Sequence, residues 1–329
     1  MSIEIINSFF ASVQDFGRKG YRSLGVPVAG AMDQLSAAYA NTLVGNRSNE
    51  ALIEVIGGSF SFKILKESLI AVTGADADLI VNDTKARTWK ALFVNEGSVI
   101  EIRLKQRGLV NYISFAGGID VPSLMQSKST YYRGGFGGFH GRLLKNGDVL
   151  PLKTTDVHSV LDEVAGKRPT KDVLERIPDR DEILNLRATK GIHVDLFSED
   201  FNRIFQFIYT VGSSCDRMGY RLEGQCIEKA RILGRVITTA VDRGYVQLPP
   251  DGKPIVLMAD SQTTGGYAVI LHVIREDVDR LAQCSTGHKV RFSLVDTMTA
   301  EQFTALYSSI LRNPPLQEPE EEYYGELPW

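Results

Sequence analysis

Residues Ser12–Asp33 read SVQDFGRKGYRSLGVPVAGAMD, and the rest of the chain is organised around this stretch. Charged residues and glycines surround two apolar triplets, Leu24–Val26 and Ala29–Ala31, and neither a helical nor a strand period persists. The glycines and Pro27 allow backbone angles that other residues resist. Such a loop either walls a polar pocket, because it presents carboxylate and guanidinium groups, or is a solvated surface turn with an ordinary ion pair.

The composition is that of a soluble globular protein. The chain has 329 residues, enough for about two domains, with 43% hydrophobic and 23% charged residues and a formal net charge of −3. This charge gives no electrostatic reason to expect nucleic acid or a membrane surface as a partner. The N-terminus lacks the pattern of a signal peptide, no apolar run approaches the ~20 residues of a membrane helix, and the three cysteines form no CxxC pair. We therefore expect a cytoplasmic protein without disulfides.

Short strand-like runs dominate both halves of the chain. Each run is bounded by Gly, Asn, Asp or a charged turn, and they lie at Ile3–Ile6, Ala51–Ile56, Ser59–Ile64, Ser68–Thr73, Asp78–Val81, Trp89–Val94, Ser98–Leu104, Leu109–Phe115, Arg235–Val241, Tyr245–Leu248, Ile255–Ala259, Tyr267–Val273 and Lys289–Leu294. Helices are predicted at Gln34–Leu43, Asp277–Leu281 and Ala300–Leu311. Many short strands with few helices favour an all-β barrel or sandwich over a doubly wound sheet.

The two halves carry a weak internal echo. Gly58–Phe62 aligns with Gly244–Leu248, and Leu69–Val72 then falls on Ile255–Met258 without a gap. The Asp, Arg and Gly-Tyr-Arg of Asp15–Arg22 likewise recur in Asp216–Arg221. The echo favours two similar β units, each with one copy of this turn. The predicted boundaries are a first unit at 1–152, a charged and proline-bearing linker at 153–187, a second unit at 188–312, and an acidic tail at 313–329 that we expect to be disordered.

The common self-sufficient catalytic motifs are absent from the sequence. It contains no GxxxxGK[ST] phosphate loop, no clean GxGxxG, no HExxH and no GxSxG, and the five histidines are scattered. No small apolar motif presents an acceptor lysine, so we expect no covalent biotin on this chain.

Turn-borne acidic and basic residues are the remaining chemistry. Carboxylates can act as bases or hold a metal on a phosphate, and arginines bind carboxylates or phosphates bidentately, although each residue could equally stabilise its own turn. The catalytic candidates are Asp15, Arg18, Asp33, Asp216, Arg217 and Asp260. The candidates for binding substrate or nucleotide are Gln14, Asp76, Arg133, Arg142, Gln247, Gln262 and Thr263.

Several long motifs in order resemble one family. They are the opening stretch, ANTLVGN at Ala40–Asn46, AGGIDVP at Ala116–Pro122, GRLLKNGD at Gly141–Asp148, SSCDRMGYRLEG at Ser213–Gly224 and VQLPPDGKPIVLMADSQTTGGY at Val246–Tyr267. Together they resemble the family of the 5-oxoprolinase C subunit, also known as allophanate hydrolase subunit 2 or the biotin-dependent carboxyltransferase A/B domain, which includes KipA. The resemblance runs from about Ser8 to Phe292.

The resemblance implies a mainly β fold of two cyclophilin-like β-barrel units in tandem with a few short helices. It implies one component of an ATP-dependent 5-oxoprolinase, which hydrolyses 5-oxo-L-proline to L-glutamate and acts only as a multi-subunit complex. The implied partners are the B subunit, which is similar to allophanate hydrolase subunit 1, and the A subunit. ATP with Mg²⁺ would be the co-substrate of a phosphorylation step shared with the B subunit. The residue roles given above remain inferences from polar positions inside the motifs.

Two other functions stay open, together with one unusual residue. The same domain occurs in urea carboxylase, so the chain could be a carboxyltransferase component. It could also be a non-catalytic, KipA-like antagonist of a kinase inhibitor. Cys215 stands where the family usually has serine, and it is either a nucleophile or, since no histidine is near it in sequence, a small substitution in a turn.

Overall fold

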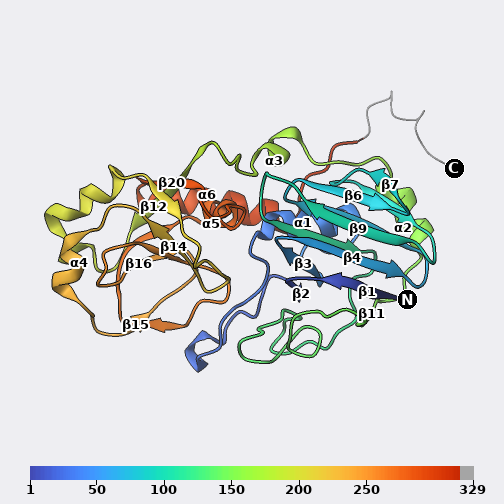
Figure 1. The fold of residues 1–329 in the computed structure, drawn as a ribbon, viewed down its shortest axis with the longest axis horizontal. Helices are drawn as coiled ribbons and strands as arrows, with labels where there is room; N and C mark the ends of the chain where they lie inside the picture. Colours follow the sequence, from blue (N-terminus) through green and yellow to red (C-terminus); the bar gives the residue numbers. More distant parts are fainter. Residues whose placement is uncertain (319–329) are drawn as a thin grey trace. The chain divides into compact units, whose positions relative to one another are not determined.

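The structure, a computed structural model, describes residues 1–318 and divides into two compact units (Figure 1). Unit 1 contains Met1–Phe16, Gln34–Ile177 and residues 310–318, and unit 2 contains Gly17–Asp33 and Pro178–Ser309. The opening stretch is therefore divided after Phe16. Most of it groups with the second half of the chain, whereas the predicted boundaries place all of it in the first unit.

Unit 1 is built from two antiparallel sheets. The six-stranded sheet has the order β11-β1-β4-β9-β6-β7, and the five-stranded sheet has the order β2-β3-β10-β5-β8. The strands are β1 (Ser2–Ser8), β2 (Ala11–Gln14), β3 (Leu52–Ile56), β4 (Ser59–Ile64), β5 (Ser68–Gly74), β6 (Ala77–Val81), β7 (Thr84–Ala86), β8 (Ala91–Val94), β9 (Val99–Leu104), β10 (Val110–Phe115) and β11 (Val149–Pro151).

The core of unit 1 lies where the two sheets share one hydrophobic cluster. In β4 the alternation SFSFKI buries Phe60, Phe62 and Ile64 and turns the residues between them outward. β5 and β10 are buried along their whole length, as central strands covered on both faces are. Phe62 of one sheet meets Phe115 of the other edge to face, with ring centroids 5.5 Å apart.

Unit 2 contains a closed barrel of strands in the order β12-β19-β16-β17-β14-β13-β20. These strands are β12 (Ile183–Lys190), β13 (Tyr209–Val211), β14 (Gly219–Glu223), β16 (Tyr245–Leu248), β17 (Ile255–Leu257), β19 (Ala268–Val273) and β20 (Lys289–Leu294). β15 (Thr239–Ala240) and β18 (Thr264–Gly265) form a separate two-stranded ribbon. The mainly β prediction is confirmed.

The barrel begins inside the segment that the sequence predicts to be a linker. Leu184, Leu186 and Ala188 of β12 are buried at alternate positions, and β12 pairs in parallel with β20 and antiparallel with β19. The residues between them, such as Asn185 and Arg187, are polar or charged, so the sequence of this segment resembles a charged linker. The linker prediction is therefore wrong for residues 183–187, which form the first part of β12.

Short helices complete both units. In unit 1 α1 (Gln34–Leu43) matches its predicted bounds and packs on β5 and β10, while α2 (Val157–Val164) and α3 (Lys171–Glu175) lie in the predicted linker. Unit 2 carries α4 (Glu228–Leu233) and α5 (Arg275–Ala282), together with the 3-10 turns η1 (Arg22–Leu24), η2 (Val194–Leu196) and η3 (Ser198–Phe205). The last helix is α6 (Thr297–Arg312).

The beginning of the predicted tail is ordered. Gln317 pairs with Arg168 through two backbone hydrogen bonds of 2.8 and 3.2 Å, so residues 313–318 do not fit the prediction of disorder. The rest of that prediction, residues 319–329, lies outside the described residues.

The predicted internal echo is not matched by strand pairing. β16 and β17 pair directly in unit 2, whereas the aligned strands of unit 1, β4 and β5, belong to different sheets.

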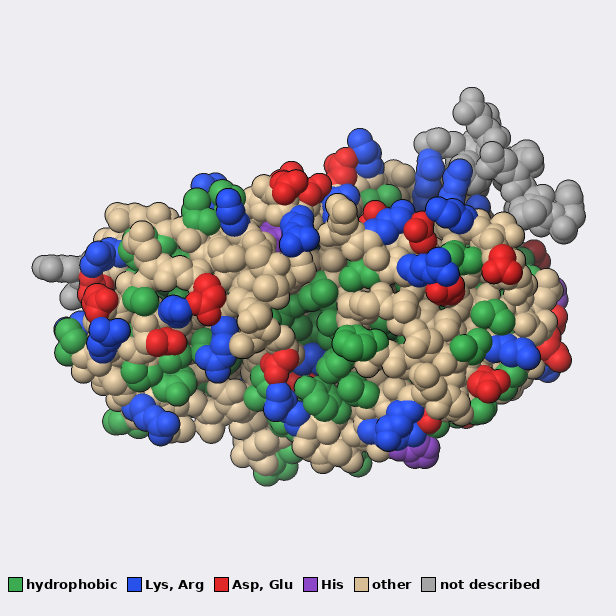
Figure 2. Space-filling model, viewed as in Figure 1, with side chains coloured by type: hydrophobic (Ala, Val, Ile, Leu, Met, Phe, Trp, Pro, Cys, Tyr) green, Lys and Arg blue, Asp and Glu red, His purple; other side chains and the backbone are tan. Residues whose placement is uncertain are grey.

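Lys and Arg side chains are interspersed with Asp and Glu over the visible face (Figure 2). Within residues 1–318, no helix has the length and apolar character needed to cross a bilayer.

Candidate functional site

The segment Gly17–Asp33 folds back on itself at its glycines. Gly17 has φ +81°, and a Cβ there would lie 2.5 Å from the carbonyl oxygen of Val28, so only glycine fits. Arg18 N–H donates to that same carbonyl at 2.8 Å. The turn η1 ends at Gly25, whose φ of 79° is again left-handed. These glycines fix the path of the backbone that carries the polar side chains.

Arg217 attaches this segment to the barrel. Its guanidinium pairs bidentately with Asp260, with Nε to Oδ2 at 2.9 Å and Nη2 to Oδ1 at 2.8 Å, and Nη2 also donates to Gly30 O at 2.7 Å. Arg217 is 1% exposed and Asp260 0%. The structure therefore brings these two predicted catalytic residues together, but as a buried pair that holds the loop.

Further buried polar groups hold the end of the segment. The Arg243 guanidinium donates to the backbone oxygens of Ala31 and Met32 and pairs with Asp279 at 2.8 Å. Asp33 accepts a 2.8 Å hydrogen bond from Gln283 Nε2. Arg18 is also fully buried. The sequence predicts Arg18 and Asp33 to be catalytic; both are buried within unit 2, and their catalytic role stays a prediction.

A partly exposed group of polar residues remains on unit 2, and we name Arg22, Asp242, Gln262 and Thr263 the Arg22 patch. Arg22 lies 3.2 Å from the Asp242 carboxylate and donates to the backbone oxygens of Val241 and Gln262. The side chains of Arg22 and Asp242 are 23% and 54% exposed. This patch therefore presents a cation, amide and hydroxyl donors, and one carboxylate at the surface, which is suitable for holding an oxyanion or a carboxylate.

Gln247 supports the patch from beneath. It is buried and accepts a 3.2 Å hydrogen bond from Gln262 Nε2 at its own Oε1. A Cβ on Gly265 would lie 2.6 Å from Gln247 Nε2, so the glycine permits this close approach. The predicted binding residues Gln247, Gln262 and Thr263 therefore come from adjacent parts of one region.

Asp216 and Cys215 occupy a turn. The carboxylate of Asp216 accepts backbone hydrogen bonds from Met218 at 2.7 Å and Gly219 at 3.3 Å, which is a turn-forming arrangement. Burial raises the pKa of the Cys215 thiol to about 11, and its Sγ lies 3.5 Å from Arg221 O. A thiol with a raised pKa carries little thiolate at neutral pH, which favours the interpretation of Cys215 as a small substitution in a turn.

In unit 1, Asp15 and Gln14 hold the glycine-rich loop at residues 126–148, which reads QSKSTYYRGGFGGFHGRLLKNGD. Asp15 accepts hydrogen bonds from Ser127 Oγ at 2.7 Å, from Lys128 N at 2.6 Å and from Ser129 Oγ. Gln14 is fully buried and donates to Thr130 O at 3.2 Å. Both are predicted site residues, and these bonds make them anchors of the loop.

The other predicted residues of unit 1 are dispersed. Arg142 pairs bidentately with Asp148 at 2.7 and 2.8 Å, and this guanidinium lowers the pKa of Asp148. Arg133 is exposed over the ring of Tyr132. Asp76 is half exposed and lies 3.9 Å from Lys105. These contacts are local to each residue and do not join the three into one site.

The predicted carboxylates do not fit a dedicated metal site. Among residues 1–318, no three His, Cys, Asp or Glu side chains come together in a way that could hold an ion. Asp15, Asp216 and Asp260 already accept the hydrogen bonds described above. We therefore derive no step through a metal bound to this chain.

Sequence reasoning missed Asp242 as a member of the patch and left Arg22 outside the list of site residues. A signal was present for both. Arg22 lies in the opening stretch, and Asp242 lies in the charged turn between the predicted strands Arg235–Val241 and Tyr245–Leu248.

Several known proteins are similar in sequence to most of this chain. The chain is 33% identical over 296 residues to the 5-oxoprolinase C subunit of Haemophilus influenzae, covering 88% of this chain and 90% of that protein. It is 34% identical to the 5-oxoprolinase C subunit of Escherichia coli, with 89% and 92% covered. It is also 29% identical to urea amidolyase of Lachancea kluyveri, where the match covers 89% of this chain but 17% of that protein.

A solved structure is similar to this chain in its fold. Urea amidolyase of Kluyveromyces lactis superposes with a TM-score of 0.83 at 25% identity, covering 97% of this chain and 20% of that one. The family described as carboxyltransferase domain, subdomain A and B, matches residues 24–294. The chain therefore belongs to the carboxyltransferase domain A and B family, together with the C subunits of 5-oxoprolinase.

Proposed function

We propose that this chain is one component of an ATP-dependent 5-oxoprolinase and works with the A and B subunits to hydrolyse 5-oxo-L-proline to L-glutamate. The observation that carries the proposal is the identity of 33–34% to 5-oxoprolinase C subunits over about nine-tenths of both chains.

The chemistry suits a phosphorylation step. An unstrained lactam resists attack by water, and transfer of the γ-phosphoryl group of ATP to its oxygen makes the ring carbon more electrophilic. Water then adds at that carbon, the carbon–nitrogen bond breaks with the nitrogen leaving as the amine of glutamate, and a second water displaces phosphate from the resulting acyl phosphate. Charge then develops on oxygens, where arginine, amide and hydroxyl donors stabilise it. In our proposal Arg22 holds a carboxylate or phosphoryl oxygen, while Gln262 and Thr263 donate the neighbouring hydrogen bonds.

ATP with Mg²⁺ is proposed as the co-substrate at a site completed by the B subunit. This arrangement is consistent with a chain that has no phosphate loop of its own. A site shared with the B subunit also leaves buried ion pairs such as Arg217–Asp260 in their structural role.

A second candidate is a carboxyltransferase component that acts on a urea-like amide. The superposition on urea amidolyase, with a TM-score of 0.83 and 97% of this chain covered, supports it.

A turnover assay distinguishes the two candidate functions. The chain is mixed with the A and B subunits, 5-oxo-L-proline and ATP, and glutamate is measured. A mixture that forms no glutamate, yet transfers a carboxyl group from a biotin carrier to urea, would favour the second candidate over the first.

A further inference from the structure

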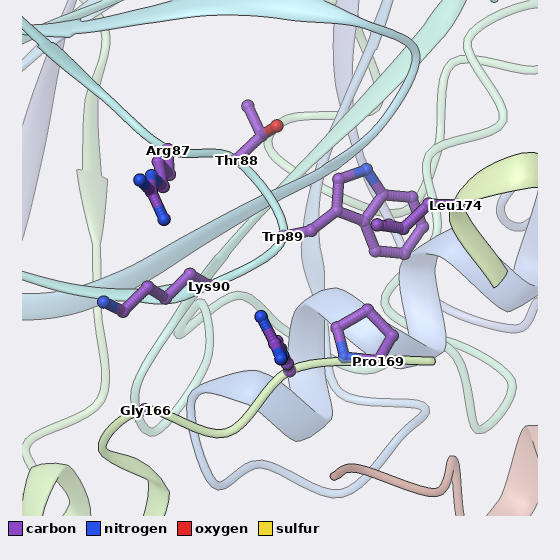
Figure 3. Close-up of a pocket in the computed structure, with 8 residues that line it drawn as sticks. Arg87, Thr88, Trp89, Lys90, Gly166, Pro169 and Leu174 are labelled. Carbon is purple, nitrogen blue, oxygen red and sulfur yellow. The ribbon is translucent and has the colours of Figure 1, made fainter. Parts of the chain in front are cut away.

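A small cavity of unit 1 lies between the turn after β7 and the segment that runs into α3 (Figure 3). Its lining includes Trp89, Lys90 and Pro169, but no carboxylate, imidazole or thiol. The titratable side chains in this lining are Arg and Lys, whose ordinary pKa values lie above ~10. The cavity therefore offers no acid or base that works near neutral pH.

His272, in contrast, is an imidazole on the barrel of unit 2, in β19. Its backbone pairs with Tyr245 of β16 on one side and with Thr189 of β12 on the other. The rings of His272 and Tyr245 meet edge to face, with centroids 4.8 Å apart. His272 nevertheless keeps an exposed surface, so its ring is accessible to a ligand.

One turn, residues 241–245, connects His272 to the Arg22 patch. Near the start of the turn, the Asp242 carboxylate lies 3.2 Å from the Arg22 guanidinium. Near its end, a Cβ on Gly244 would lie 3.3 Å from Cδ2 of His272, so the turn packs directly against the imidazole. The turn that carries Asp242 therefore touches Arg22 at one end and His272 at the other.

The backbone fixes this turn in its position. Gly244 N–H donates to Leu257 O at 2.8 Å, and Gly244 O accepts a hydrogen bond of 2.8 Å from Val273 N–H. Gly244 has φ +86°, and a Cβ there would lie 2.8 Å from Val273 O, so only glycine permits this approach. The placement of the patch and the imidazole relative to one another is thus set by ordered backbone, as the positioning of reacting groups requires.

The surroundings keep His272 neutral near pH 7. Burial lowers the pKa of His272 below the ordinary ~6.5, while the Asp242 carboxylate and the backbone of Arg243 act in the opposite direction. A neutral imidazole accepts a proton, and a general base is most effective when its pKa lies close to the working pH.

The charged side chains on β12, β16 and the turn are Arg187, Lys190, Asp242 and Arg243. The two arginines lie in ion pairs of 2.8 Å with the buried carboxylates of Asp277 and Asp279. Lys190 is one residue along from the strand partner of His272, so its side chain lies on the opposite face of the sheet. Asp242 is therefore the charged group on these elements that acts on the imidazole.

We propose that His272 is a catalytic residue at the Arg22 patch, where it takes a proton from the attacking water and passes it to the leaving nitrogen. Asp242 is a positioning residue between His272 and Arg22. This inference rests on the proposed function, because it assigns the proton transfers of that reaction.

Each proton of the attacking water has a destination. As the water oxygen bonds to the ring carbon of the phosphorylated lactam, one proton passes to the neutral imidazole. The imidazolium then donates that proton to the ring nitrogen while the carbon–nitrogen bond breaks, and the electron pair of that bond stays on nitrogen. The other proton leaves the new hydroxyl group for solvent as the carbonyl of the acyl phosphate forms. His272 is then neutral again.

The His272→Gln variant tests this role in the mixture of the chain with the A and B subunits, 5-oxo-L-proline and ATP. Glutamine is polar but cannot carry the proton, so kcat is expected to fall at least about 100-fold while KM changes less than about threefold. His158→Gln is the matched control and should leave kcat unchanged. His158 is also exposed and stacks on an aromatic ring, that of Phe93, but it lies on α2 in unit 1.

The pH profile separates proton transfer from a structural role. For the parent complex, kcat/KM should fall as the pH drops through the pKa of His272, which lies below ~6.5, and the residual activity of His272→Gln should lack this acid limb. Equal kcat values of the two histidine variants, or an acid limb unchanged in His272→Gln, would overturn this inference while glutamate still forms. No glutamate from the parent complex would instead overturn the proposed function, and this inference with it.

Discussion

Arg217 and Asp260 form a bidentate ion pair from which water is excluded, with side chains 1% and 0% exposed. Nη2 of the same arginine also donates to Gly30 O, so one guanidinium connects the barrel to the segment Gly17–Asp33. The pair thus links the motif SSCDRMGYRLEG to the opening stretch.

Removal of one member of this pair should destabilise the protein strongly. Asp260→Ala leaves a buried guanidinium without its carboxylate, and the expected loss is about 3–5 kcal/mol in the free energy of unfolding. The double variant Arg217→Met, Asp260→Leu should recover much of that loss, since it buries no unpaired charge. Urea denaturation measures both. Arg203→Ala, which removes an exposed partner of Asp200, is the control and should cost about 0–1 kcal/mol. A loss at Asp260 no larger than that of the control would disprove the structural role.

Gly17 and Gly20 offer a matched pair of substitutions. Both have positive φ, +81° and +92°, but a Cβ at Gly17 would meet Val28 O at 2.5 Å, whereas no atom lies within 4 Å of one at Gly20. Gly20→Ala should therefore cost only the conformational strain, about 1 kcal/mol. Gly17→Ala should cost at least about 2 kcal/mol more, because the backbone must move. Thermal unfolding of the two variants would reveal the difference, and equal melting temperatures would argue against the tight fold of the loop.

Asp15 should behave as an anchor of the glycine-rich loop. Asp15→Ala removes the acceptor of Ser127 Oγ, Lys128 N and Ser129 Oγ, and we expect a loss of about 3 kcal/mol. Limited proteolysis should also cut faster within residues 126–148. Asp162→Ala, an exposed position on α2, serves as the control. Normal stability and unchanged proteolysis, combined with lost activity, would instead restore a catalytic role for Asp15.

Acid should weaken the Arg142–Asp148 pair. The guanidinium of Arg142 lowers the pKa of Asp148 in the folded protein, so the stabilisation is complete above the ordinary pKa of aspartate, ~3.9, and is lost as the pH falls through the lower folded value. Asp148→Asn should therefore be less stable than the parent by about 1 kcal/mol at neutral pH. The difference should shrink in strong acid. Parallel stability curves from neutral pH into strong acid would contradict this assignment.

The Arg22 patch can be tested without changing the fold. Thr263→Val replaces a partly exposed hydroxyl by a methyl group of the same size, and the loss of one hydrogen bond to a developing charge should lower kcat/KM by about tenfold or more. Thr210→Val on β13, which is also partly exposed on the same barrel, should leave kcat/KM unchanged. Equal activities of the two variants in the complex would remove Thr263 from the proposed site.

Much of the fold is predictable from local pattern. β4, β16, β20 and α1 match their predicted bounds because their apolar residues repeat at the period of the element they form. β12 is not predicted because its outward positions carry Asn185 and Arg187, which resemble a linker when the pairing with β20 is unknown. Long-range pairing of this kind leaves little trace in one sequence.

The candidate site is less predictable. Residue type identifies Arg217, Asp260 and Asp15 as polar groups in glycine-rich turns, but it does not indicate whether they are buried and paired. Burial determines which of these groups is accessible from the surface, and burial depends on contacts between distant segments, such as that between Gly30 and Arg217. Arg22, whose side chain is 23% exposed, differs from Arg217, whose side chain is 1% exposed, mainly in its burial.

The fate of the lactam oxygen tests the central claim most directly. 5-Oxo-L-proline labelled with ¹⁸O at the ring carbonyl is converted by this chain together with the A and B subunits and ATP, and the released phosphate is analysed by mass spectrometry. After phosphorylation of the lactam oxygen, addition of water at the ring carbon breaks the carbon–nitrogen bond and leaves an acyl phosphate, and a second water attacks the acyl carbon and expels phosphate. That phosphate keeps the original lactam oxygen, so we predict one ¹⁸O in the phosphate. Phosphate without label, or no glutamate from the complete three-protein mixture, would contradict the proposed function.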